Sequence, residues 1–465
     1  MGREGRDEAV RRMVDRGVDR RAITVFEDYW DQLAAGAQGI VREDEIEPLV
    51  DVPELAAIEV GDDERRAALA QVAVVKLNGG LGTSMGMSGP KAALVARDGL
   101  TFLDVIVRQL IGLEERYGSR PPLLLMNSFR TRDASLEILE RYPQMAKQAL
   151  PLDFLQNMEP KLDAQTLSPV DWPEEPELEW CPPGHGDVYV ALAASGLLDE
   201  MRAAGIRYAF ISNSDNLGAT CDPDIAAWLI AEEIPFAMEV AERTLNDRKG
   251  GHVAVRRSDG RLVLRESAMV LDEEQGLFQD TDRHQWFNTN NLWIDLDRLD
   301  ALLCEREGVL GLPIIVNRKT VDPTRSESTP VIQIESAMGS AIESFEGSVA
   351  LRVPRSRFRP VKTTNELLLL RSDAFELDEH SRVVSRIDGR EPRVRLDGVY
   401  KLVRDFDARF PSGPPSLREC TSFAVEGDVT FGADVRAVGD VEVVAQEPAE
   451  VADGTRLEGR VALSP

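Results

Sequence analysis

The chain has 465 residues, of which 43% are hydrophobic, and a formal net charge of −27. This composition predicts two or three globular units with substantial cores. A surface this acidic repels polyphosphate backbones and anionic lipids, so we expect neither nucleic acid nor a membrane as a partner. No apolar run approaches the roughly 20 residues of a membrane-spanning helix, and the N-terminal stretch MGREGRDEAVRRMVDRGVDRR is charged rather than signal-like. We therefore expect a cytoplasmic protein.

The cysteines, histidines and lysines limit the kinds of site. The cysteines lie far apart without a CxxC pair, which fits a reducing compartment and argues against a cysteine-based zinc site; the four histidines are scattered too, which disfavours a histidine metal cluster. Only eight of the 54 basic residues are lysines. Where a compact ammonium group must meet a phosphate, arginine is no equivalent replacement. Half of the lysines fall within the motifs described below, namely Lys76, Lys91, Lys249 and Lys362.

The first two segments of the chain differ in texture. Residues 1–70 are expected to form an N-terminal helical segment, because 26–40 and 64–72 carry apolar side chains at three- to four-residue spacing. Residues 71–375 alternate short β-rich runs with helical stretches, which predicts a doubly wound, largely parallel sheet of the Rossmann-like α/β class. The expected strands are 72–77, 122–127, 208–215, 236–241 and 292–296, and the expected helices include 102–118 and 223–233.

Two further segments have a character of their own. Residues 168–187 are rich in proline and acid and have no period, which predicts a long surface loop of the kind that often carries function. Residues 376–465 consist of short alternating runs separated by glycine and aspartate, such as GDVTFGADV and GDVEVV. Their spacing favours a C-terminal β-helix-like domain.

The most informative stretch is LNGGLGTSMGMSGPK at residues 77–91, in which five of fifteen residues are glycine. A glycine-rich turn after a strand exposes backbone N–H groups without side-chain bulk, which is a common way to bind phosphate. The stretch matches neither GxxxxGK[ST] nor GxGxxG, since its lysine follows proline and precedes Ala92. A kinase-type phosphate loop is therefore disfavoured, and a purely structural turn is the simpler alternative.

The stretch resembles the signature loop of the sugar-1-phosphate nucleotidylyltransferases, and in form it is most similar to the eukaryotic-type UTP-glucose-1-phosphate uridylyltransferases. The resemblance continues in order to the C-terminus. It is carried by LLMNSF (124–129), FLQNMEPKL (154–162), PPGHGD (182–187), SNSDNLGAT (212–220), KGG (249–251), FNTNNLWI (287–294), VPRSRFRPVKTTNELLLL (353–370) and VEGDVTFG (425–432).

This resemblance implies a reversible, Mg²⁺-dependent nucleotidyltransferase with two small-molecule substrates, UTP and glucose 1-phosphate. A phosphate oxygen of the sugar phosphate attacks the α-phosphorus of UTP and pyrophosphate leaves. The catalytic residues implied are Lys91, Lys362 and Asp215, with Asp215 also the metal ligand. The nucleotide-binding residues implied are Leu77, Asn78, Gly79, Gly80, Lys91, Gln156 and Gly184, among which the Gln156 amide can recognise the uracil edge.

The residues implied to bind the sugar phosphate are His185, Asn213, Lys249, Gly250, Asn288 and Asn290. The glycines on both sides of His185 favour close approach of a ligand. The C-terminal domain is interpreted as an accessory or assembly module, through which a homo-oligomer could form.

Three alternatives stay open from the sequence. A related pyrophosphorylase acting on other UDP-sugars or on N-acetylhexosamine 1-phosphate would carry the same motifs. A non-catalytic sugar-nucleotide-binding protein would be favoured by loss of Lys91, Asp215 or Lys362, all of which are present. A purely structural β-helix protein would leave this set without a role.

Overall fold

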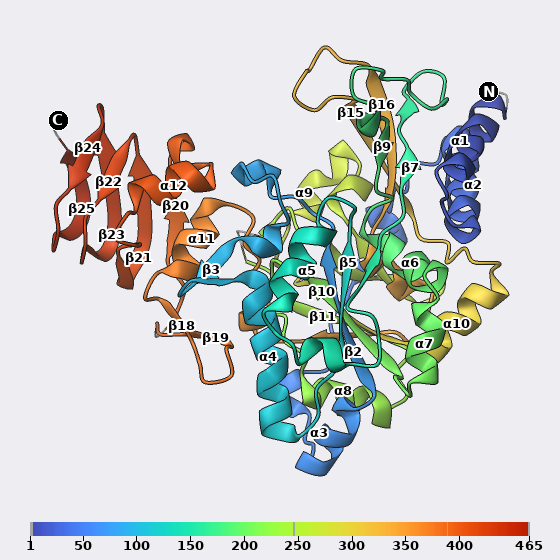
Figure 1. Ribbon diagram of the computed structural model, residues 1–465, viewed down its shortest axis with the longest axis horizontal. Coiled ribbons are helices and arrows are strands. Elements are labelled where there is room, and N and C mark those ends of the chain that lie inside the picture. Colours follow the sequence, from blue (N-terminus) through green and yellow to red (C-terminus); the bar gives the residue numbers. More distant parts are fainter. Residues whose placement is uncertain (1–2, 245–246, 388, 464–465) are drawn as a thin grey trace.

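A mixed β-sheet forms the centre of the molecule, which is a computed structural model described for residues 3–244, 247–387 and 389–463 (Figure 1). Ten strands of the described residues belong to this sheet, with the order β1-β12-β14-β10-β2-β5-β6, β13 beside β12, and β11 and β17 joined through β14. Their bounds are β1 Ile46–Pro48, β2 Val72–Asn78, β5 Leu123–Asn127, β6 Asp153–Leu155, β10 Tyr208–Asn213, β11 Phe236–Glu242, β12 His252–Arg256, β13 Leu262–Arg265, β14 Trp286–Asp295 and β17 Val349–Arg352.

The sheet is less parallel than the alternation predicts, so that part of the prediction is wrong. Strands β6, β5, β2 and β10 are parallel, but β14 runs antiparallel to both β10 and β11, and β12 pairs antiparallel with β1, β13 and β14. Among the described residues between β11 and β14, the chain forms the antiparallel β12–β13 hairpin and then the one-turn helix α9 (Gln275–Phe278), with no helix long enough to cross a face of the sheet. Parallel neighbours are usually joined by such a crossover helix, so β14 lies antiparallel to β11.

The α/β class is confirmed, with helices on both faces of the sheet. Along β2, Val72 and Val74 belong to one hydrophobic cluster, whereas Ala73 and Val75 belong to the other. The first cluster includes residues of α3 (Asp62–Leu69), α4 (Phe102–Tyr117), α5 (Arg132–Glu140), α8 (Pro223–Ala231) and α11 (Thr364–Arg371); the second includes residues of α6 (Val188–Ala194), α7 (Leu197–Ala203) and α10 (Leu296–Glu305). A strand buried on both faces has no polar alternation, which is why VAVVKL is continuously apolar up to its lysine.

Local signals account for the helix boundaries. Helix α4 begins after Thr101, whose hydroxyl accepts from the Asp104 backbone N–H while the Asp104 carboxylate accepts from Thr101. It ends at Gly118, which has a left-handed backbone. Such a reciprocal cap and a terminal glycine satisfy the unpaired groups of a helix.

The N-terminal segment is not purely helical. Helices α1 (Glu4–Asp15) and α2 (Arg20–Ala34) pack on a small antiparallel sheet of β15 (Ile314–Thr320), β16 (Pro330–Ser336) and β8 (Leu162–Asp163). Strand β1 then joins the edge of the central sheet. The segment 168–187 carries β9 (Trp180–Cys181), which pairs with β7 (Glu159–Pro160), and a short 3₁₀ helix at His185–Asp187.

The C-terminal part extends from one side of the molecule, opposite the N-terminus (Figure 1). Its strands pair in parallel, with β20 (Arg393–Arg395), β21 (Ser416–Glu426), β23 (Arg436–Ala445) and β25 (Arg456–Leu463) in one sheet, and β22 (Val429–Phe431) and β24 (Ala449–Val451) in another. Before most of these strands come a hairpin of β18 (Phe375–Leu377) and β19 (Val383–Ser385) and the helix α12 (Val403–Arg409). Elsewhere in the chain, β3 (Val95–Arg97) pairs with β4 (Leu100–Thr101). One hydrophobic cluster continues from α4 into the C-terminal strands.

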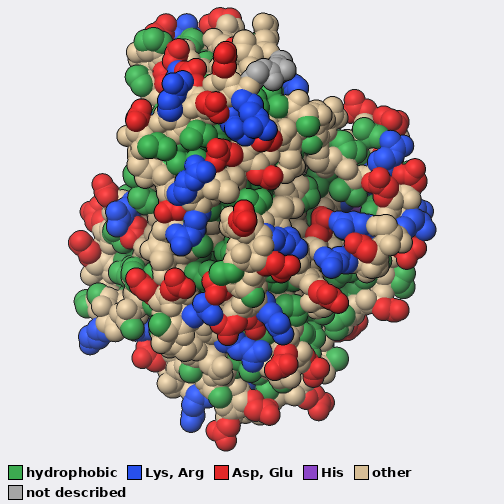
Figure 2. Space-filling model, turned by 90° about the vertical axis from the view of Figure 1, so that its right-hand side faces the viewer, with side chains coloured by type: hydrophobic (Ala, Val, Ile, Leu, Met, Phe, Trp, Pro, Cys, Tyr) green, Lys and Arg blue, Asp and Glu red, His purple; other side chains and the backbone are tan. Residues whose placement is uncertain are grey.

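The surface carries both signs of charge despite the large negative total. Figure 2 shows the face at the right-hand side of Figure 1, where acidic and basic side chains are interspersed over the whole view. Among the described residues, none of the helices is both long and apolar enough to span a bilayer.

The attachment of the C-terminal strands generates a first prediction. The fully buried Tyr400 hydroxyl donates to the Val429 carbonyl at 2.6 Å and accepts from the Val429 N–H at 3.2 Å. Tyr400→Phe leaves both buried groups without this partner, so we expect a loss of about 1–3 kcal/mol in the free energy of unfolding. Denaturant unfolding measures it, with the exposed neighbour Val399→Ala as the control. Equal stability of Tyr400→Phe and wild type would contradict it.

Candidate active site

The glycine-rich stretch folds back on itself beyond the end of β2. A backbone bridge joins Leu81 to Pro90, and the Lys91 N–H donates to the Gly80 carbonyl at 3.3 Å. The loop therefore returns Lys91 to the point where the strand ends. Ligands of parallel α/β sheets bind at this carboxyl end of the strands.

Three charged side chains from distant parts of the chain meet there. One carboxylate oxygen of Asp215, Oδ2, accepts from Lys91 Nζ at 2.9 Å and from Lys362 Nζ at 2.8 Å. Asp215 is 7% exposed, and its other oxygen, Oδ1, has no hydrogen-bond partner among the described residues. Burial alone would raise the pKa of Asp215, but the Lys362 and Lys91 ammonium groups outweigh it and hold the pKa below its usual value. The three predicted catalytic residues thus form one cluster.

Two predicted nucleotide-binding segments lie against each other. A side chain at Gly79 would collide with the Gln156 amide, since a Cβ there would lie 2.4 Å from Gln156 Oε1. Gly79 therefore lets the Gln156 amide approach the loop backbone. Leu77 is half-buried, and Gly80 is exposed.

The predicted nucleotide residue Asn78 has its side chain engaged inside the protein. Its amide donates to Asn127 Oδ1 at 2.8 Å and to Ser135 Oγ at 2.7 Å, and accepts from Ser214 Oγ at 3.1 Å. These contacts join β2, β5 and the segment that carries Asp215. Beside it in the sheet, Leu77 is the register partner of Asn213, which ends β10.

The segment around His185 is shaped by glycines. Gly184 has a φ of 82°, and a Cβ there would lie 2.7 Å from the Ser336 carbonyl. His185 Nδ1 accepts from the Met338 backbone N–H at 3.0 Å. Burial, with a further effect of the Lys362 ammonium, lowers the pKa of His185 to about 4. The ring is therefore neutral at pH 7 with its proton on Nε2, which can donate to a ligand.

The asparagines of β14 face the KGG segment. Asn288 Nδ2 donates to Asn290 Oδ1 at 2.8 Å, and the Asn288 backbone N–H donates to the Gly251 carbonyl at 3.0 Å. Asn290 has a left-handed backbone with a φ of 58°. Lys249 is exposed, next to Gly250, and among the described residues it forms no hydrogen bond or ion pair with the other predicted sugar-site residues. The structure thus places Asn288 against Asn290 and against Gly251, the neighbour of Gly250, whereas among the described residues no hydrogen bond or ion pair links them to Asn213 or Lys249.

Sequence reasoning missed Glu266. Its carboxylate would lie 2.5 Å from a Cβ at Gly251, and Asn288 forms a hydrogen bond with it. Burial raises the pKa of Glu266, although the bond to Asn288 opposes this. A carboxylate beside two asparagines can accept from sugar hydroxyls. In the sequence, the only sign of this residue is that Glu266 directly follows β13, the strand that pairs with HVAVR (252–256).

Asp187 was also missed, although it lies within GHGD. Its carboxylate accepts from the Asn157 backbone N–H at 2.6 Å and from Asn157 Nδ2 at 2.7 Å. Burial raises the pKa of Asp187 to about 6, against the effect of these bonds. Through Asp187, the segment that carries His185 holds the residue next to Gln156 in place.

A glycine-rich loop at the end of a strand of an α/β sheet, with two lysines on one aspartate, is the arrangement expected of a protein that binds phosphate groups. Comparison with known proteins identifies the family. Residues 23–437 match the family described as UTP–glucose-1-phosphate uridylyltransferase. The chain belongs to this family.

The similarity extends over nearly the whole chain. A UTP–glucose-1-phosphate uridylyltransferase of Astragalus penduliflorus is 40% identical over 419 residues, covering 89% of this chain and 86% of that protein. A UDP-glucose phosphorylase structure from Trypanosoma brucei has a TM-score of 0.90 at 42% identity, covering 99% and 100% of the two chains. A Leishmania major UDP-glucose pyrophosphorylase mutant in complex with UDP-glucose has a TM-score of 0.92 at 38% identity, covering 99% of both.

The protonation of His185 generates a second prediction. Its folded pKa of about 4 lies below the ordinary value of 6.5, so between these pH values the unfolded state binds more protons. The contribution of His185 to stability is therefore unchanged above pH 6.5 and is lost as the pH falls toward 4. We expect the unfolding free energy of wild type, relative to that of His185→Gln, to decrease as the pH falls from 6.5 toward 4. A difference that is flat or moves the other way would contradict it.

Proposed function

We propose that this chain catalyses the reversible reaction of UTP with glucose 1-phosphate to give UDP-glucose and pyrophosphate. The observation that carries the proposal is the meeting of Lys91 and Lys362 on Asp215 at the carboxyl ends of β2 and β10, in a chain of this family. A phosphate oxygen of glucose 1-phosphate bonds to the α-phosphorus of UTP. The bond from that phosphorus to the oxygen of the β-phosphate breaks, and pyrophosphate leaves with the electron pair.

The nucleotide is assigned to the segments around Gly79 and Gln156. The backbone from Leu77 to Gly80 lies against the uridine, the Gln156 amide pairs with the uracil edge, and Gly184 leaves room for the base. Lys91 and Lys362 then exchange their contacts with Asp215 for phosphate oxygens. Their charges neutralise the negative charge that spreads over the phosphates during transfer.

The sugar phosphate is assigned to His185, Asn213, Asn288, Asn290 and the backbone at Gly250. The support is chemical, since a neutral Nε2–H donor, amides and the Glu266 carboxylate provide both donors and acceptors for hydroxyl groups. Lys249 is exposed and stands two residues before Gly251, and we assign it to the phosphate of the sugar.

The residues fit a divalent cation held partly by substrate. Among the described residues, no cluster of three or more His, Cys, Asp or Glu side chains could hold a metal. Asp215 nevertheless offers a buried carboxylate oxygen without a hydrogen-bond partner in the described chain. Mg²⁺ is commonly bound by one or two carboxylates together with phosphate oxygens and water, so we propose Asp215 as its protein ligand. When bound, the ion supplies charge neutralisation and polarisation at the α-phosphate.

The remaining assignments concern the molecule as a whole. We propose an N-terminal segment (1–70) that carries α1, α2, β1 and α3, a catalytic domain (71–375) and a β-helix-like C-terminal domain (376–465). Residues 1–2, 245–246, 388 and 464–465 of these domains lie outside the described part of the chain. The parallel pairing of β21, β23 and β25 supports the β-helix-like C-terminal domain. A cytoplasmic location and assembly of homo-oligomers through the C-terminal domain complete the proposal.

A substrate panel tests the function. UTP, CTP, TTP, ATP and GTP are each paired with the 1-phosphates of glucose, galactose and N-acetylglucosamine, and pyrophosphate release is measured. We expect UTP with glucose 1-phosphate to give the highest kcat/KM, because the Gln156 amide matches the uracil edge. A higher value for another sugar would assign the chain to a related pyrophosphorylase, and inactivity with every pair would overturn the proposal.

The role of Asp215 generates a prediction on the metal. Asp215→Asn keeps the size but removes the charge that holds the cation and both lysines. We expect similar thermal stability, a fall in turnover of about a hundredfold or more, and partial recovery at raised Mg²⁺ or Mn²⁺. Steady-state rates over a metal titration measure this, with wild type in excess chelator as the companion experiment. Full activity in either case would contradict the metal role.

A further inference from the structure

Asp215 and Lys362 stand on two segments that are joined along their backbones. The Val361 N–H donates to the Asp215 carbonyl at 3.1 Å, and the Arg359 N–H donates to Asn216 Oδ1 at 2.8 Å. A Cβ at Gly218 would lie 2.3 Å from the Ser356 carbonyl, so the segments touch without space for a side chain. The separation of the Asp215 carboxylate and the Lys362 ammonium therefore depends on how this joined pair of segments is held.

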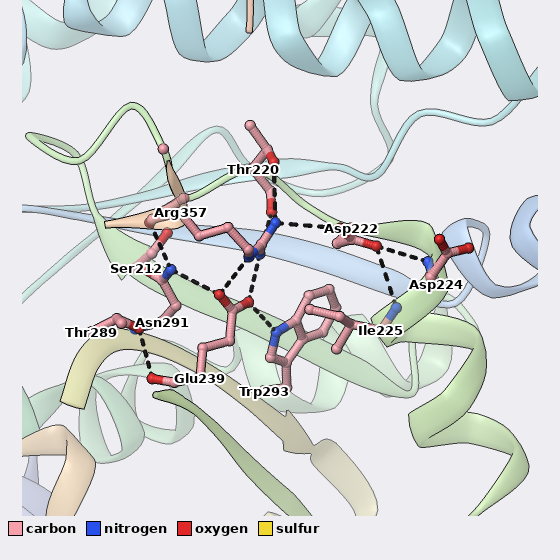
Figure 3. Close-up of polar contacts among 12 residues, drawn as sticks. Ser212, Thr220, Asp222, Asp224, Ile225, Glu239, Thr289, Asn291, Trp293 and Arg357 are labelled. Atoms are coloured by element: carbon pink, nitrogen blue, oxygen red, sulfur yellow. Dashed lines mark hydrogen bonds and ion pairs between the residues drawn. The ribbon is translucent and has the colours of Figure 1, made fainter. Parts of the chain in front are cut away.

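Arg357 belongs to the same segment as Lys362, and Figure 3 shows its guanidinium between Glu239 and Thr220. Its guanidinium binds Glu239 through two hydrogen bonds, Nε to Oε2 at 2.6 Å and Nη2 to Oε1 at 2.5 Å. Nη2 also donates to the Thr220 carbonyl at 2.9 Å, and the Arg357 carbonyl accepts from Asn216 Nδ2 at 3.1 Å. Arg357 therefore contacts the Asp215 segment with both its side chain and its backbone, two residues before Arg359.

Glu239 in turn has a single orientation set by the central sheet. It projects from β11, is fully buried, and accepts from Trp293 Nε1 at 2.9 Å and from Asn291 Nδ2 at 3.0 Å. Figure 3 shows these side chains converging on the carboxylate from β14. A planar guanidinium bound at both carboxylate oxygens has little rotational freedom.

A second buried basic side chain binds the same segment. Lys76, on β2, donates to the Ala219 carbonyl at 2.7 Å and to Ser212 Oγ at 2.8 Å. Consecutive carbonyls, those of Ala219 and Thr220, thus accept from side chains of two different elements, which ties this turn to the sheet at two points.

We propose that Arg357, oriented by Glu239, is a positioning residue for the transfer reaction proposed above, on which this inference rests. It holds the segments of Asp215 and Lys362 at one position relative to the sheet. The Lys362 ammonium and the Asp215 carboxylate can then meet the substrate phosphates without a shift of the backbone segments that carry them. A misplacement of about 1 Å in such a site can reduce turnover about a hundredfold.

Arg357→Lys tests the proposal, because an ammonium group keeps the charge but cannot bind both Glu239 oxygens and Thr220 in one plane. We expect kcat to fall at least about thirtyfold while the KM values for UTP and glucose 1-phosphate change less than about threefold, since Gln156 and His185 lie on segments other than those that Arg357 and Glu239 bind. Glu239→Gln, which keeps the shape of the acceptor, should show the same pattern and serves if Arg357→Lys does not fold.

Arg409→Lys is the matched control. Arg409 is largely buried and, like Arg357, binds both oxygens of one carboxylate, with Nε 2.8 Å from Asp428 Oδ1 and Nη2 2.8 Å from Asp428 Oδ2, in the C-terminal part of the chain. This variant should lose thermal stability but keep kcat. If the control variant and Arg357→Lys lost the same stability and also showed the same fall in kcat, Arg357 would be a structural residue only, and the proposal would be overturned.

A spectroscopic measurement separates this inference from the proposed function. With only eight lysines, ¹³C-methylation gives a spectrum in which Lys362, 58% exposed in its side chain, is assigned by Lys362→Arg. We expect its resonance to move in Arg357→Lys and Glu239→Gln but not in Arg409→Lys. An unmoved resonance overturns the positioning role whatever the substrate, whereas an inactive wild type with a moved resonance overturns only the proposed function.

Discussion

The site depends on one carboxylate oxygen that receives two ammonium groups. Lys91 precedes Asp215 by 124 residues and Lys362 follows it by 147, yet both contact Oδ2. A buried carboxylate is costly unless charges and hydrogen bonds compensate it. The glycine loop returns Lys91 to the end of β2, and the segment after β17 places Lys362 over Asp215. The same cations are then available to phosphate oxygens in a chain whose net charge of −27 would otherwise repel them.

Below this cluster, a second layer of buried charge fixes where the cluster lies. Removing one partner of a buried ion pair typically costs about 3–5 kcal/mol of stability. Replacing both partners by well-packed apolar side chains, in contrast, often leaves stability unchanged or raises it. The Arg357–Glu239 pair is therefore explained better by geometry than by stability. It joins β11 and β14 to the turn after Asp215, and Lys76 joins β2 to the same turn. Burial, together with the nearby Arg357 charge, lowers the pKa of Lys76 to about 7, so this amine loses its proton far more readily than an exposed lysine does.

The part of the site proposed for the sugar phosphate is built differently, from neutral donors and shaped backbone. His185 is kept neutral by burial, and its segment approaches Ser336 closely because Gly184 and Gly186 have no side chains. Met338 donates to His185, and a Cβ at its neighbour Gly339 would lie 2.8 Å from Asn288 Nδ2. One turn of chain thus connects the segment of His185 to the asparagines of β14, and the neutral groups keep a fixed mutual geometry.

The sequence alone determines the strands and motifs that depend on local signals. The apolar run of β2, the helix α4 and the glycine loop were predictable, because each follows from residue type and short spacing, whereas Lys91, Asp215 and Lys362 were singled out by the resemblance of their motifs to those of a known family. The tertiary structure alone decided the rest. The antiparallel course of β14, the entry of β1 into the sheet, and the roles of Glu266, Asp187 and the Arg357–Glu239 pair depend on contacts between residues far apart in the chain. A glutamate in an apolar strand does not indicate its partner, since a buried charge acquires its meaning only when the fold supplies the opposite charge.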